Sequence, residues 1–175
     1  LRSQVEEDNL TENFITKLIE VKNFESVVNI VTMILMFLKR KIKSYKIELD
    51  DLASVRRRSK QILYGLARPD KEKIKSIQSQ FDIREDENGT YLLTRPFDIE
   101  KKIINFEYVL LDGSTIVGKS ILKSHHIHVS SVEREISKLL DNKLYVMGAR
   151  GYLKRLQKSC HTCKRIRQEI SKSKM

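Results

Sequence analysis

The amino-acid sequence predicts a mainly α-helical protein that carries a small β insertion. Apolar residues recur at helical spacing through the first seventy and the last fifty residues, whereas the middle of the chain shows short alternating segments around a turn. The chain has 175 residues, of which 40% are hydrophobic and 33% charged. This composition is typical of a folded protein with a heavily ionised surface, and the length suffices to bury a hydrophobic core.

Three helices are expected in the N-terminal region. Residues 9–12, Asn-Leu-Thr-Glu, offer polar side chains that can cap a first helix, whose apolar side chains follow directly. A second helix is expected over residues 25–43. Its apolar run Val27–Leu38 is shorter than the roughly 18 residues that a membrane-spanning helix requires, so we expect a buried helix and no membrane partner. A third begins near Asp51, whose carboxylate suits a helix N-terminus, and ends by Arg68 because a proline follows.

The middle of the chain predicts strands. Residues 86–89, Asp-Glu-Asn-Gly, form a turn between the segments 81–84 and 91–94, which together predict a β-hairpin. Residues 106–111 are rich in apolar and aromatic side chains and predict another strand. Residues 116–117, Ile-Val, are expected to add a short return strand.

The last segment is predicted to be helical again. One helix has an apolar face at 132, 136, 139 and 140, and residues 144–148 interrupt the helical pattern. A final continuous helix is expected from about Arg150 past Cys163, because apolar residues recur there at steps of three and four. Its stripe consists of Leu153, Leu156, Cys160 and Cys163.

These patterns divide the chain into three predicted segments. Residues 1–72 form a helical N-terminal region, residues 73–119 a small strand-containing extension, and residues 120–175 a C-terminal helical domain.

Positive charge is concentrated at the C-terminal end. The formal net charge is +11 and the sequence pI is near 9.6. Between Arg150 and Lys174 there are nine basic residues and one acidic residue, so this stretch carries +8 of the total. Such a distribution favours a polyanionic partner, with nucleic acid ahead of an anionic membrane surface.

Histidine and cysteine residues are clustered in an order that suits a metal ion. Three histidines lie at His125, His126 and His128, and 31 residues separate His128 from Cys160, the first of the two cysteines Cys160 and Cys163. Two imidazole nitrogens and two thiolates are a tetrahedral ligand set for Zn²⁺, and four protein ligands make such a site structural. Either His125 or His126 can complete the set. We favour His125, because residues three apart share one helical face.

Other interpretations of the same residues are possible. The cysteine pair lies on an apolar stripe and could be core packing, since free cysteine behaves as a small hydrophobic residue. A redox pair is disfavoured because no thioredoxin-like strand–helix context surrounds it. The histidines could form a solvated helix end, and His161 is expected to point away from the two cysteines. The ordered combination favours zinc, and two cysteines without a disulfide framework indicate an intracellular protein.

The C-terminal segment resembles a known family. Tyr145, Gly148 and Arg150 precede a helix that ends in the pair Cys160-x2-Cys163, with Met147 where that family usually has proline. Over residues 121–167 this arrangement resembles the zinc-binding domain of retroelement integrases, in the form found in BEL/Pao retrotransposons. Residues 24–38 and 81–94 resemble, more weakly, the regions upstream of that domain in the same polyproteins.

The resemblance implies a fold and a role. The expected fold of residues 120–175 is a zinc-held three-helix bundle of helix-turn-helix type, with His125, His128, Cys160 and Cys163 as ligands. The expected role is non-catalytic: such domains contact the ends of the element's DNA and promote integrase multimerisation during DNA integration. The chain would be a Pol polyprotein fragment without the integrase catalytic core, and hence no enzyme. The expected location is the nucleus or a virus-like particle.

The C-terminal cations are the expected DNA contacts. The residues expected to touch DNA are Arg150, Lys154, Arg155, Lys158, Lys164, Arg165 and Arg167.

The alternative to the integrase role is a domesticated, zinc-stabilised protein–protein interaction module that does not bind DNA. A thiol-based redox enzyme is a further rival.

Overall fold

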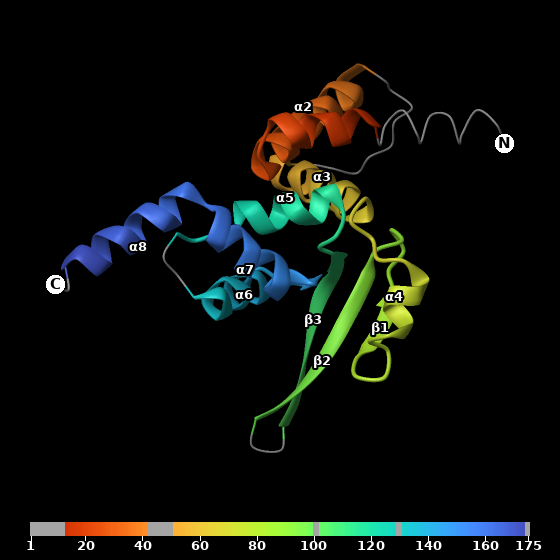
Figure 1. Cartoon of the computed structure of the whole chain (residues 1–175). Coiled ribbons are helices and arrows are strands. Elements are labelled where there is room, and N and C mark those ends of the chain that lie inside the picture. Colours follow the sequence, from red (N-terminus) through yellow and green to blue (C-terminus); the bar gives the residue numbers. More distant parts are fainter. Residues whose placement is uncertain (1–12, 42–50, 100–101, 129–130, 174–175) are drawn as a thin grey trace.

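The computed structural model describes residues 13–41, 51–99, 102–128 and 131–173. The protein is mainly helical and contains one four-stranded sheet, which confirms the predicted fold class (Figure 1).

The sheet has the strand order β1-β2-β3-β4. Strands β1 (Asp82–Glu85) and β2 (Tyr91–Ile99) form the predicted antiparallel hairpin, and β2 pairs antiparallel with β3 (Lys102–Asp112). Gly89 closes the hairpin turn at a φ of 71°, a left-handed conformation that glycine adopts without strain. The predicted hairpin and the predicted strand at 106–111 are therefore confirmed.

Strand β4 (Leu144–Met147) was not predicted, because four residues offer too short a pattern. It pairs in parallel with the end of β3, with Leu144 opposite Val109. Its side chains alternate between two hydrophobic clusters, one on each face of the sheet. The segment that interrupts the helical pattern is therefore an edge strand that joins the C-terminal residues to the sheet.

The N-terminal helices agree with the sequence prediction. Residues 13–21 are helical, and α2 (Phe24–Lys41) and α3 (Leu52–Gly65) follow. Asp51 caps α3 by accepting a hydrogen bond from the Ser54 N–H. The predicted capping residues 9–12 lie outside the described residues.

Helices α2 and α3 are held together at both polar and buried positions. Arg56 forms an ion pair with Glu25, and the buried hydroxyls of Thr32 and Ser59 lie 2.9 Å apart. The short helix α4 (Lys71–Lys75) covers the other face of the sheet through Ile74.

The predicted return strand at 116–117 is wrong. These residues begin α5 (Ile116–Ser124), which Thr115 caps by accepting a hydrogen bond from the Gly118 N–H at 2.9 Å. Asp112 turns the chain away from β3, because one of its carboxylate oxygens accepts the Ser114 N–H at 2.8 Å. Local side-chain capping therefore outweighs the strand propensity of an Ile-Val pair.

The predicted continuous final helix is also wrong. Helix α7 (Ala149–Ser159) ends before Cys160, whose backbone is extended with φ −63° and ψ 121°, and α8 (His161–Ser173) then begins. Preceding α7 are α6 (Val132–Asp141), as predicted, and β4. One extended residue therefore separates two helices and changes the direction in which the cysteine side chains point.

One hydrophobic core joins the three predicted segments. It includes Leu63 from α3, Leu111 from β3 and Leu153 from α7, all fully buried. The boundaries at residues 72 and 119 stay a prediction about how the chain is divided. The shared core means that the C-terminal helices pack against the sheet and the N-terminal helices.

We predict that Gly118→Ala destabilises the protein. A Cβ at this position would lie 2.0 Å from the backbone oxygen of Asp112. A backbone atom cannot move aside as the end of a flexible side chain can. The expected loss is about 1–3 kcal/mol of unfolding free energy, measured by urea denaturation. Gly65→Ala is the matched control, because nothing lies within 4 Å of its added Cβ and the free energy should hold or rise. Equal stability of both variants would contradict this close approach.

A second prediction concerns pH. Burial raises the pKa of the Asp112 carboxyl, but hydrogen bonds from Lys73 and Ser114 outweigh burial and hold the pKa below 3.8. Since the folded-state pKa is depressed, the contribution to stability is present above about pH 4 and lost as pH falls through the folded pKa. The unfolding free energy of wild type should exceed that of Asp112→Asn by about 1 kcal/mol at pH 7, and this difference should disappear as pH falls through the folded-state pKa. A difference in unfolding free energy between the two proteins that does not change with pH would exclude this charge effect. The exposed Asp82→Asn serves as control.

Candidate metal centre

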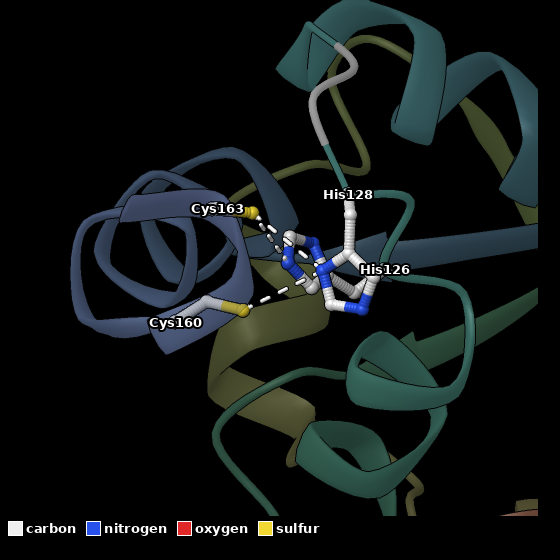
Figure 2. Close-up of side chains that lie close together, drawn as sticks. All are labelled: His126, His128, Cys160 and Cys163. Atoms are coloured by element: carbon white, nitrogen blue, oxygen red, sulfur yellow. Dashed lines mark hydrogen bonds between the residues drawn. The ribbon is translucent and has the colours of Figure 1, made fainter. Parts of the chain in front are cut away.

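Four side chains from separate parts of the C-terminal region meet at one point. His126 and His128 come from the loop after α5, Cys160 from the junction of α7 and α8, and Cys163 from the first turn of α8 (Figure 2). One ligand atom from each residue can be chosen so that all four lie within 4.8 Å of one another. The residues described thus contain a group of two histidines and two cysteines that could hold a metal ion.

The distances within this cluster agree with tetrahedral coordination. Cys163 Sγ lies 3.3 Å from His126 Nε2 and 3.6 Å from His128 Nδ1, and Cys160 Sγ lies 3.5 Å from His128 Nδ1. Zn–S bonds of about 2.3 Å and Zn–N bonds of about 2.0–2.1 Å place sulfur and nitrogen roughly 3.5 Å apart on a tetrahedron. Small adjustments of the rings would therefore let all four atoms contact one Zn²⁺ ion.

The ligand set differs from the predicted one at a single histidine. His125 is not in the cluster: it is the C-cap of α5, and its Nδ1 lies 2.9 Å from the backbone oxygen of Ile121. His126 takes its place. The prediction assumed that residues 125 and 128 share a helical face, but α5 ends at Ser124, so the spacing rule does not apply to the loop.

Comparisons with protein-family models, curated proteins and solved structures find no match to this chain. Among the residues that the structure describes, no helix combines the length and the apolarity needed to cross a membrane. The chemistry of the site is therefore argued from its own residues.

The cysteine pair lies in an environment that favours thiolate. The Cys163 backbone N–H and the His126 side chain lower the pKa of the Cys160 thiol from 9.0 to about 6. The Cys163 N–H belongs to the start of α8, where unpaired backbone N–H groups favour negative charge. Thiolate is the form that binds metal, so the first turn of α8 prepares Cys160 for coordination.

The donor set fits zinc better than the alternatives. Two sulfurs and two imidazole nitrogens are borderline to soft ligands and suit tetrahedral Zn²⁺, whereas Mg²⁺ and Ca²⁺ prefer oxygen. Simple core packing accounts for the burial of Cys163, which is 1% exposed, but it does not account for two imidazole nitrogens within 3.6 Å of its sulfur. His161 is exposed and lies outside the cluster, as predicted.

The predicted DNA contacts are all exposed. Arg150 forms an ion pair with Glu133 at 3.2 Å, and Arg165 lies 3.8 Å from Glu169. The structure therefore presents these cations to solvent, where phosphates could reach them. They comprise Arg150, Lys154, Arg155 and Lys158 on α7 and Lys164, Arg165 and Arg167 on α8.

Residues 113–120, Gly-Ser-Thr-Ile-Val-Gly-Lys-Ser, match the phosphate-binding pattern G-x-x-x-x-G-K-S between a strand and a helix. In a phosphate-binding loop of that kind, free backbone N–H groups surround the phosphates. Here the Gly118 N–H donates to Thr115, and the Ser114 N–H donates to Asp112. Because these donors are occupied within the chain, the pattern caps α5 and does not form a nucleotide site.

We predict that His126→Ala weakens zinc binding enough for the ion to be lost during purification, and that His125→Ala retains it. His126 contributes Nε2 to the cluster, whereas the ring of His125 bonds to the backbone of its own helix. Wild type and His125→Ala should contain one zinc per chain by elemental analysis after purification in reducing buffer. Zinc loss from His125→Ala with retention in His126→Ala would reverse the ligand assignment.

Proposed function

We propose that this chain binds one structural Zn²⁺ ion and presents a cationic surface to DNA, as the non-catalytic zinc-binding part of a retroelement integrase. The observation that carries the proposal is the convergence of His126, His128, Cys160 and Cys163 at tetrahedral distances. The ion would supply a four-ligand cross-link with no open position for catalysis.

The cross-link would fix the base of α8. This helix extends away from the rest of the protein in Figure 1, and its residues 167–172 are all exposed. Cys163, in its first turn, is a buried member of the metal cluster. Because metal binding and local folding are coupled, zinc removal should release α8 while the shared core persists.

The surface of α7 and α8 is strongly basic. Lys154, Arg155 and Lys158 are exposed on α7, and Lys164 and Arg167 are exposed on α8. Cations at such positions neutralise phosphates and release counterions, which makes binding tight at low salt and independent of sequence. The resemblance of residues 121–167 to integrase zinc-binding domains favours the element's DNA ends and other integrase subunits as partners.

A second candidate is a zinc-stabilised protein–protein interaction module. The N-terminal helices favour it, because several large apolar side chains there are solvent-exposed: Phe14 at 52%, Met33 at 62% and Phe37 at 59%. Met33 and Phe37 are four residues apart in α2 and therefore share a helical face, and a contiguous apolar patch is typical of protein contacts. Binding that depends weakly on salt would distinguish this candidate from a DNA-contacting one.

We predict that DNA affinity depends steeply on salt and requires the α7 cations. If about four cations contact phosphates, log affinity should fall against log salt with a slope near −3.6. The triple variant Lys154→Ala, Arg155→Ala, Lys158→Ala should bind more weakly and with a slope nearer zero, measured by fluorescence anisotropy on duplexes of two unrelated sequences. Its zinc content should stay at one per chain, since none of the three is a ligand.

The matched control removes the same charge elsewhere. Lys17→Ala, Arg57→Ala, Lys75→Ala changes three exposed cations outside α7 and α8 and should leave the slope near the wild-type value. Equal weakening by both triple variants would assign binding to total charge. An α7 variant with unchanged affinity and slope would exclude this surface as the DNA contact.

A further inference from the structure

Glu135 is an acidic residue in a position where a helix normally places an apolar one. It lies in α6 between Val132 and Leu139 on the buried face, and its side chain is 0% exposed. Glu133, two residues earlier on the same helix, has a side chain that is 61% exposed. Burying a carboxylate is costly unless charged or hydrogen-bonding partners compensate it, so the surroundings of Glu135 indicate its role.

The partners of Glu135 connect it to the metal cluster. Its Oε1 accepts the backbone N–H of Ile127 at 3.1 Å and lies 3.2 Å from Nε2 of the buried Gln157. The same oxygen lies 2.8 Å from Nδ1 of His126, whose side chain is only 6% exposed. The carboxylate therefore joins the loop after α5 and helix α7 to its own helix, α6, at one point.

The geometry determines which nitrogen of His126 is free to bind a metal. Glu135 faces Nδ1, while Nε2 faces Cys163 Sγ at 3.3 Å. A neutral imidazole carries its proton on one nitrogen, so an Nδ1–H that donates to Glu135 leaves the Nε2 lone pair directed at the cluster. Carboxylates that hold metal-binding histidines in this way orient the ring and raise its basicity as a ligand.

We propose that Glu135 is a positioning residue for the metal centre, which sets the tautomer and the orientation of His126. This inference rests on the proposed zinc site and extends it to a residue that is not itself a ligand. A divalent ion on Nε2 would place positive charge on the ring that the buried carboxylate contacts. Because Glu135 also contacts Ile127 and Gln157, it would couple metal binding to the packing of α6 against α7.

The first test compares two matched charge-removing variants. Glu135→Gln should bind zinc about 10–100-fold more weakly than wild type in competition with a chromophoric chelator. Glu133→Gln removes the same charge from the same helix at an exposed position and should bind as wild type does. The zinc-induced increase in Tm should shrink in Glu135→Gln only, a readout that a purely structural role would leave unchanged.

A double-mutant cycle tests whether Glu135 acts through His126. In a His126→Ala background, the residual zinc affinity should be the same with Glu135 and with Gln at that position. A full additional loss there would overturn the positioning role.

Wild-type protein provides a test that needs no variant to fold. A long-range ¹H–¹⁵N spectrum of the zinc-loaded chain should show His126 protonated at Nδ1 and metal-bound at Nε2. The opposite tautomer would overturn this inference and leave the zinc site intact, as would wild-type affinity in Glu135→Gln. A wild-type chain without zinc affinity would overturn both the site and the role of Glu135.

Discussion

The parallel pairing of β4 with β3 is the constraint on which the candidate metal centre depends. Helix α5 follows β3 and α7 follows β4, so both helices start at the same edge of the sheet and contact each other. With 9 and 11 residues, they extend about 14 and about 17 Å from that edge. His126 and His128 follow the first helix and Cys160 follows the second, so two helices of similar length bring the ligands together.

The metal centre would orient the basic surface without adding to its positive charge. Two thiolates neutralise a divalent ion, so a Zn²⁺ at this site adds no net positive charge to the surface. The positive field comes from side chains of α7 and α8, and the site would decide where those side chains point. The break at Cys160 matters for the same reason, because α8 starts there and its base carries Cys163.

Residues 113–120 and Glu135 show why local sequence patterns have limited value for assigning chemistry. Residues 113–120 match a phosphate-binding pattern, yet Thr115 and Asp112 already accept the backbone hydrogens that a phosphate would need. Glu135 belongs to no pattern, yet it contacts His126 of the candidate metal centre. Its one sequence signal is position: the acid falls on the apolar face of α6, three residues after Val132. In both cases the partner atoms, and not the residue types, determine the chemistry.

The sequence by itself determined the fold class, the hairpin, helices α2, α3 and α6, and three of the four clustered ligands: His128, Cys160 and Cys163. These features follow from periodicity, capping and residue type, which act over a few neighbouring residues. The helix at residue 116 also follows from local capping, by Thr115, which the strand prediction overlooked. The tertiary structure decided the rest: strand β4, the extended Cys160, and His126 in place of His125. Each of these depends on where helices end and on contacts with residues about thirty positions away, which no local pattern records.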